Sequence, residues 1–199
     1  RSSGLTIKGT TLGSPASRAA QDGLSLSAWN DSNLVGAKLA SGGDMLLDAG
    51  GDVTVKAIQV NDDYSQSGFS RKKATSDVNT TWQGSSISAS GNLGVQAGND
   101  ITLTASDVSA GKNAALAAGN NLNLNAAQTE QGSSKGKSET HAIGQDRTTV
   151  SGGRDRERRA GQDVTSQAAA LAAEGKVAIQ AGRDVNLLAE ATTQGDSYK

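Results

Sequence analysis

Short stretches of this chain alternate strictly between hydrophobic and polar residues. Val53, Val55 and Ala57 are separated by Thr54 and Lys56, and the same pattern recurs along the sequence. Alternation with a period of two predicts a β-strand that buries one face. Each stretch spans about five residues and follows Gly-Gly-Asp or a similar tripeptide, which favours a tight turn. The pattern therefore predicts many short strands joined by tight turns.

The strands repeat with a fixed period. The sequence A-G-N-D-I-T-L-T-A at 97–105 returns 21 residues later as A-G-N-N-L-N-L-N-A, and related stretches lie at 49–57 and 181–189. One cycle holds about three short strands, which leaves too little chain for helical crossovers. Stacking each strand on its equivalent in the next cycle, about 4.8 Å away, gives an all-β, right-handed parallel β-helix, which is a solenoid. The spacing predicts one interior column that contains Leu5, Leu26, Leu47, Val95, Leu116 and Ile179.

Composition agrees with a narrow interior and excludes several classes of protein. The 199 residues include 25 Gly, one Pro and 3% aromatic residues, and the net charge of −1 argues against a nucleic-acid binder that relies on phosphate contacts. The chain has no Cys, which excludes disulfides and thiolate metal sites. No apolar run approaches the ~18 residues of a membrane span, and no signal peptide is expected. A flexible Gly/Ala/Ser linker is the alternative, but it would not hold Leu and Val on a lattice.

Two polar segments, 58–84 and 127–159, interrupt the lattice. We expect both to leave the coil as extended two-stranded arms, and a further arm begins near the C-terminus. Residues 1–199 are expected to form a single β-helix segment of a longer array. Continuing the lattice through the second segment would bury four cations at a large cost in free energy, namely Lys135, Lys137, Arg156 and Arg158.

The repeated units resemble filamentous-haemagglutinin repeats. The resemblance rests on the A-G-x-[DN]-[VIL]-x-[VL]-x-A units and on the S-x-[IV]-x-A-G strands that follow them, most clearly within 39–57 and 85–126. It implies a β-helical stalk of a large exoprotein of a Gram-negative bacterium, either an adhesin or haemolysin or an effector of contact-dependent growth inhibition. It also implies export through an outer-membrane transporter of the two-partner secretion type, a location at the cell surface, and contact with a target cell's outer membrane, glycan or receptor. We expect a monomer that binds no nucleic acid.

Candidate contact residues gather in the first polar segment. Aromatic residues beside cations favour interfaces with lipid headgroups or glycans, and a solvated charged loop is the alternative. The candidates are Tyr64, Phe69, Arg71, Lys72, Lys73 and Trp82.

No catalytic, cofactor or metal site is expected. His141 is the only histidine and lies in a polar segment without evident partners. Acids recur at the turns of equivalent cycles, where they are expected to accept hydrogen bonds from backbone N–H groups rather than bind Ca²⁺; these are Asp44, Asp52, Asp100 and Asp184. The alternative function is a polysaccharide lyase built on a β-helix. A lyase needs Asp, Lys or Arg clustered on one exposed strand face, whereas outward positions here include Thr102 and Asn123.

Overall fold

The protein is built from strands and tight turns. The computed structural model describes residues 4–8, 11–12, 17–66, 75–135, 137–154 and 156–198, and within these ranges every regular element is a strand. The described residues accordingly provide no helix that could cross a membrane.

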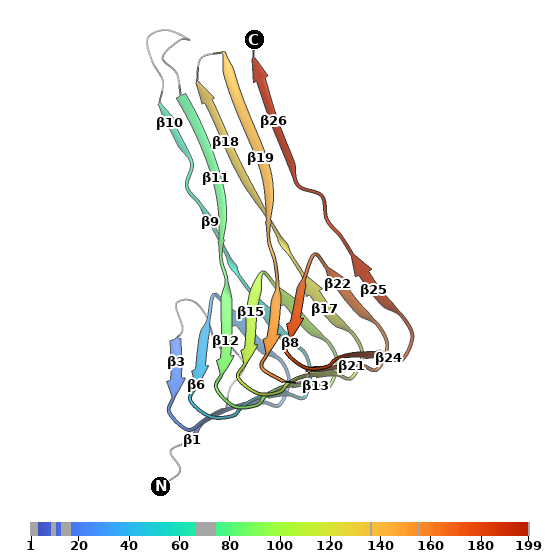
Figure 1. The fold of residues 1–199 in the computed structure, drawn as a ribbon. Coiled ribbons are helices and arrows are strands. Elements are labelled where there is room, and N and C mark those ends of the chain that lie inside the picture. Colours follow the sequence, from blue (N-terminus) through green and yellow to red (C-terminus); the bar gives the residue numbers. More distant parts are fainter. Residues whose placement is uncertain are drawn as a thin grey trace.

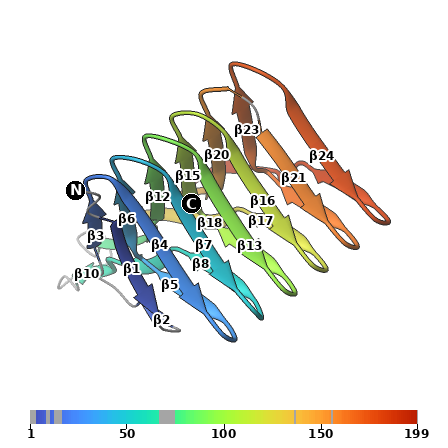
Figure 2. The same cartoon turned by 90° about the horizontal axis from the view of Figure 1, so that it is seen from below.

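Three parallel sheets form the coil, and each of the first six turns contributes one strand to each sheet, whereas the seventh contributes strands to two of them (Figures 1 and 2). Sheet A contains β1 (Gly4–Lys8), β4 (Gly23–Ala28), β7 (Met45–Ala49), β13 (Leu93–Ala97), β16 (Ala114–Ala118), β21 (Arg156–Ala160) and β24 (Val177–Ala181). Sheet B contains β2 (Thr11–Leu12), β5 (Ser32–Val35), β8 (Val53–Lys56), β14 (Ile101–Thr104), β17 (Leu122–Asn125), β22 (Val164–Gln167) and β25 (Val185–Leu188). Sheet C contains β3 (Ser17–Ala20), β6 (Lys38–Ser41), β12 (Ser85–Ala89), β15 (Ser106–Ala110), β20 (Thr149–Gly152) and β23 (Ala170–Ala173). The predicted parallel β-helix is confirmed, and we number its coils 1 to 7 by their strands in sheet A.

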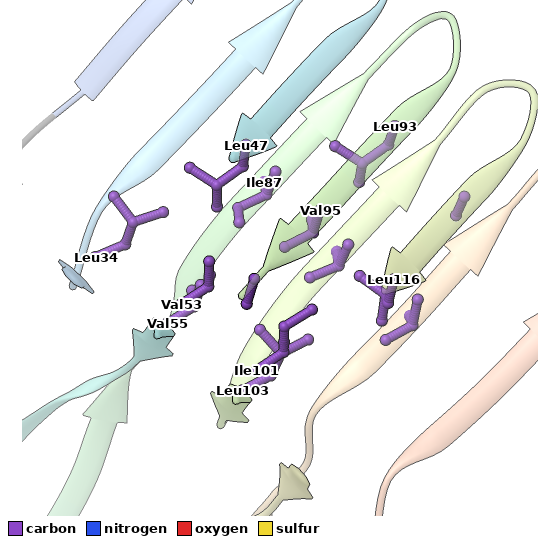
Figure 3. Packing of buried hydrophobic residues seen from close by; sticks show 14 of the residues in the cluster. Leu34, Leu47, Val53, Val55, Ile87, Leu93, Val95, Ile101, Leu103 and Leu116 are labelled. Carbon is purple, nitrogen blue, oxygen red and sulfur yellow. The ribbon is translucent and has the colours of Figure 1, made fainter. Parts of the chain in front are cut away.

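Alternating apolar residues of the three sheets fill the interior (Figure 3). In sheet A, Leu26 stacks on Leu47, which stacks on Val95 and then Leu116, as the spacing predicts. The first member of the predicted column is wrong, because Ile7 and not Leu5 pairs with Leu26. Coil 1 is therefore two residues shorter than the 21-residue period, and a lattice extrapolated from later coils misses this change.

The second polar segment returns to the coil earlier than the sequence suggested. Strands β20 and β21 belong to sheets C and A, so the departure from the coil ends at Asp146 and not at residue 159. Arg158 stands in the interior column between Leu116 and Ile179 and is 1% exposed. Strand β21 pairs with a neighbour on both sides, and leaving the coil would forfeit both sets of backbone hydrogen bonds. That loss outweighs the cost of one buried guanidinium.

Glycine is required at the turns between sheets A and B because the backbones of successive coils approach closely there. A Cβ on Gly119 would lie 1.9 Å from the carbonyl oxygen of Gly98, and a Cβ on Gly98 would lie 2.1 Å from that of Gly50. No side chain fits at such a distance, so the recurring Ala-Gly pairs in the sequence follow directly from stacking.

The corner between sheets B and C has two forms. Gly36, Ala105 and Ala168 close this corner in coils 2, 4 and 6 with φ of 56°, 45° and 48°. In coil 3 the equivalent residue, Ala57, has no such left-handed φ, and the chain continues outward into an arm instead of turning. The same position therefore determines whether the coil closes directly or opens into an arm.

The arms leave coils 3, 5 and 7 and join in one antiparallel sheet, sheet D (Figure 1). Its strands are β9 (Ile58–Asn61), β10 (Tyr64–Gln66), β11 (Thr75–Gln83), β18 (Ala127–Lys135), β19 (Ser138–Asp146) and β26 (Thr193–Tyr198). Strands β9 and β10 both pair with β11, so each complete arm occupies two strand positions. Two strand positions span about 9.6 Å, and two coils also advance about 9.6 Å. Arms on every second coil therefore pair edge to edge in one continuous sheet.

Candidate functional site: the arm sheet

Sheet D is the part of the molecule that departs from the repeating coil, and it extends away from it (Figure 1). Neighbouring arms are joined by long ladders, from Thr75–Lys135 to Thr80–Glu130 between β11 and β18 and along β19 and β26. Most side chains on its strands are exposed or half-buried, so both faces of the sheet meet solvent.

The two arms are closed at their bases by buried hydroxyl groups. The Ser85 hydroxyl donates to the carbonyl of Lys56, the last residue of β8, over 2.7 Å. The Thr148 hydroxyl donates to the carbonyl of Asn125, the last residue of β17, over 2.6 Å. Each bond joins the point where the chain leaves the coil to the point where it returns. Each carbonyl also accepts a backbone N–H from the preceding coil, Gly36 to Lys56 over 2.9 Å and Ala105 to Asn125 over 3.1 Å, so the hydroxyl is its second donor.

One face of sheet D carries a row of carboxamide and hydroxyl side chains, which we call the amide face. Its members come from registered cross-strand pairs, because partners in an antiparallel ladder lie on the same side of a sheet. Asp77 pairs with Ser133, and the Ser133 hydroxyl donates to the Asp77 carboxylate over 2.7 Å. The amide face comprises Asp77, Asn79, Gln131, Ser133, Thr140 and Gln194.

A trough runs along the amide face. A hollow of about 440 Å³ is lined by residues 77–79, 131–133 and 140–142 together with Gln194. A second hollow of about 310 Å³ shares Gln131, Ala142 and Gln194 with the first, so the two hollows are contiguous. The small residues Ala142 and Gly144 of β19 lie between the longer side chains of β18 and β26. The trough exists because the side chains of β19 are small at positions where those of β18 and β26 are large.

The opposite face of sheet D holds His141 and Glu130. The Nδ1 atom of His141 lies 3.8 Å from a carboxylate oxygen of Glu130, and both side chains are about half exposed. The imidazole is therefore solvated, with one carboxylate beside it.

Two of the candidate contact residues, Trp82 and Tyr64, lie within the described residues, and they stand apart. Trp82 lies at the base of the first arm, where its indole N–H donates to the carbonyl of Gln128 over 2.7 Å and its ring packs near Ala57 and Ala105. Tyr64 is 55% exposed and pairs with Asp77, five residues farther along β11, which corresponds to about 17 Å. Trp82 therefore links the two arms to the coil, and Tyr64 borders the amide face. Phe69, Arg71, Lys72 and Lys73 lie outside the described residues.

The turn acids form hydrogen-bonded ladders, as their recurrence predicted. The backbone N–H of Asp100 donates to the Asp52 carboxylate over 3.1 Å, and that of Asn121 donates to Asp100 over 2.9 Å. Asp44 belongs to a different column, at the turn between sheets C and A, where it accepts from the N–H of Asn92 over 2.7 Å. Within the described ranges, no group of three or more His, Cys, Asp or Glu side chains could hold a metal ion.

One ladder residue is also paired with a cation. The Nε of Arg183 donates to the carboxylate of Asp163 over 3.0 Å, and this contact holds the pKa of Asp163 below its ordinary value. Asp163 also accepts from the N–H of Asp184 over 3.3 Å. The carboxylate is therefore kept ionised for the backbone hydrogen bond that connects the two coils.

The geometry defines a class of protein, a β-solenoid with paired arms, and sequence comparison identifies the family. A sequence profile of the hemagglutinin repeat matches residues 67–197, and the chain belongs to the hemagglutinin repeat family. The tRNA nuclease CdiA of Escherichia coli O6:K15:H31 (strain 536 / UPEC) is 45% identical over 174 residues, which cover 87% of this chain and 5% of that protein. CdiA of E. coli strain STEC_O31 is 34% identical over 121 residues, covering 61% of this chain and 3% of the relative. The chain thus spans about 5% of the length of the first of these relatives, and no solved structure shows a significant match.

Proposed function

We propose that this chain is a non-catalytic stalk segment of a large secreted surface protein of a Gram-negative bacterium. The coils supply length, and the arm sheet supplies a surface for contact with a target cell. The observation that carries the proposal is the difference between the coils and sheet D. Ladders of equivalent turn residues hold the coils together, whereas sheet D exposes polar side chains on both faces. The family membership supports a stalk of an adhesin or contact-dependent inhibition protein, and nothing favours the lyase alternative.

Export of the whole protein would use a two-partner secretion transporter in the outer membrane. A chain without Cys can cross the oxidising periplasm unfolded without forming crosslinks. Each coil contacts only its neighbours, so folding outside the cell can proceed coil by coil. The nuclease activity in the name of the CdiA relatives is ascribed to those proteins, and in our proposal this segment has no part in that chemistry.

The test is to remove the arms from the full-length protein secreted by its own bacterium. Deletion of residues 58–84 or 127–147 should leave surface display intact on immunoblots of whole cells, because the coils still stack. Contact with target cells, measured by co-sedimentation and by growth inhibition, should fall. A control with Thr102→Asp, on the outward side of an unarmed coil, should retain both properties. Unimpaired contact after loss of both arms would refute the role of sheet D.

A further inference from the structure

The chemistry of the trough restricts what it could hold. Its side chains are carboxamides and hydroxyls, which both donate and accept hydrogen bonds. Among the described residues that line the two hollows there is no Lys or Arg, the side chain of His141 lies on the opposite face, and Asp77 adds a negative charge at one end. A phosphorylated or otherwise anionic ligand would meet no cation there and would be repelled by Asp77. The lining also lacks a contiguous apolar surface that could enter a lipid layer.

The shape of the trough favours an extended ligand. From Thr140 to Gly144 the floor strand β19 advances about 14 Å. Even without the second hollow, the larger one has a volume within the 300–1,000 Å³ range of sites that bind small ligands. Amide side chains stand on both sides of this floor, Gln131 from β18 and Gln194 from β26. These amides could form hydrogen bonds with successive units of one extended ligand from two sides.

Asn79 provides an acceptor that the described residues leave unused. Its Oδ1 atom is buried and receives no hydrogen bond from them. Asn79 pairs with Gln131 and lines the larger hollow, and the terminal torsion of an Asn side chain is soft. Rotation about this torsion would present the amide to a ligand, whose hydroxyl could satisfy it. A buried acceptor without a partner is costly in a stable protein, so a bound donor is a physical explanation for its presence.

Tyr64 adds an aromatic surface beside the trough. It pairs with Asp77 on the same side of the sheet, and its hydroxyl bonds with the Oε1 atom of Gln66 over 3.2 Å. The ring is therefore held in place while more than half exposed. An aromatic face next to hydroxyl-binding amides matches the two sides of a hexose ring, one of C–H groups and one of hydroxyls.

We propose that the trough on the amide face binds an extended, uncharged oligosaccharide made of hexose units. This proposal rests on the proposed contact between sheet D and a target cell, and it assigns that contact to neutral glycan. Such a glycan could be the outer part of a lipid-linked surface polysaccharide or a free polysaccharide, and the probes below separate these sources.

The experiment measures binding of the 199-residue chain to immobilised glycans. The probes are dextran oligosaccharides, the hexose outer-core oligosaccharide of lipopolysaccharide free of phosphate and sugar acid, and the complete core with its phosphates. At least one neutral probe should bind, with an affinity that changes little between low and high salt because no charge pair forms. Binding to dextran points to a free polysaccharide, and binding to the core alone points to a lipid-linked one. Gln131→Ala and Gln194→Ala should each weaken binding about threefold to tenfold, as expected for one lost neutral hydrogen bond.

A matched control lies on the same strand. Gln128 is exposed on β18 and faces the side opposite Gln131, so Gln128→Ala should bind like the unmodified chain. Gln131→Glu keeps the size of the side chain but loses its donors, and it should weaken binding even if Gln131→Ala loosens the sheet. In a chain that carries Trp29→Phe, the fluorescence of Trp82 reports whether the arms remain paired.

Three results would overturn the proposal: no binding to either neutral probe by a chain with intact arms, binding that requires the phosphates or vanishes at high salt, or equal losses from Gln128→Ala and Gln131→Ala. These results are distinct from failure of the stalk proposal. If deletion of the arms abolishes contact with cells while neutral glycans do not bind, sheet D remains the contact surface and the assignment to glycan falls.

Discussion

Ala105 and Ala57 occupy one register position in two backbone conformations. Both methyl groups are buried in the same small cluster, but only Ala105 has a left-handed φ, of 45°. Left-handed φ is strained for alanine and free for glycine, whereas glycine weakens an extended segment. We expect Ala105→Gly to be less destabilising than Ala57→Gly by about 1 kcal/mol in urea unfolding. Both variants remove one buried methyl group. Equal decreases in the free energy of unfolding would therefore show that the corner is unstrained.

Thr148 closes the second arm with a single hydroxyl group. It is 0% exposed, donates to Asn125 over 2.6 Å and accepts from the N–H of Ser106 over 3.4 Å. Thr148→Val keeps the shape, removes the acceptor of the buried Ser106 N–H and leaves the Asn125 carbonyl with only the Ala105 N–H, so it should lower the free energy of unfolding by about 1–3 kcal/mol. Thr102→Val, on an outward position, should change it by less than about 0.5 kcal/mol. If the two substitutions cost the same, the hydroxyl is not what closes the arm.

At the scale of elements, an armed coil and an unarmed coil share one framework. Ser106, the first residue of β15, and Thr148, just before β20, stand at equivalent positions, and Ala126 is equivalent to Ala105. Deleting residues 127–147 joins Ala126 to Thr148 and reproduces the Ala105–Ser106 corner. The variant should therefore fold into a coil with the β-sheet content expected from circular dichroism. Its Ala126 would need the left-handed conformation that Ala105 already adopts.

The control is a deletion that starts at the same residue but ends at residue 159 instead of residue 147. Removing residues 127–159 also removes β20 and all of β21 except Ala160, and these strands lie inside sheets C and A. That variant loses two interior strands and should unfold at a clearly lower urea concentration than the variant without 127–147. Equal midpoints would mean that β20 and β21 are not part of the coil.

The coils could be predicted from the sequence, but the ends of the second arm and the pairing of the arms could not. Interior positions such as Leu47 and Leu116 follow from alternation combined with the 21-residue period. Arg158 could not be placed, because the sequence shows the cost of burying a cation but not the backbone pairing that offsets it. The trough was missed because Asn79 and Gln194 meet only through ladders between different arms. Those ladders depend on how far apart the coils hold the arms, and no local pattern shows this distance.

At the scale of the whole molecule, the spacing of the coils and the spacing of sheet D must agree. Deleting residues 106–126 removes one full coil and would bring two arms, each two strands wide, onto neighbouring coils about 4.8 Å apart. The remaining coils should still stack, but the two arms can no longer pair side by side. We expect faster trypsin cleavage at Lys135 and a changed Trp82 fluorescence, both signs of a disrupted sheet D.

A longer deletion is the matched control. Removing residues 106–168 takes away two coils together with one arm, and the remaining arms are again two coils apart. Although it removes three times as much chain, including Lys135, this variant should keep β11 paired with β26. Slow hydrogen exchange of the β11 amides in this variant, and fast exchange of the same amides in the shorter deletion, would show the difference. If the shorter deletion left sheet D undisturbed, the two spacings would not be coupled.

Because the spacing of the coils must match the spacing of the strands in sheet D, the length of such a chain can change only in certain steps during evolution. Val55 and Leu124 occupy equivalent positions on successive armed coils, 69 residues apart, and Leu124 and Leu187 are 63 residues apart. Unequal recombination between the near-identical coils of one gene would produce gains and losses of any whole number of coils. Only an even number keeps the sheet of arms intact. Natural length variants should therefore differ by steps of two coils and one arm, so the heritable unit of this stalk is a pair of coils.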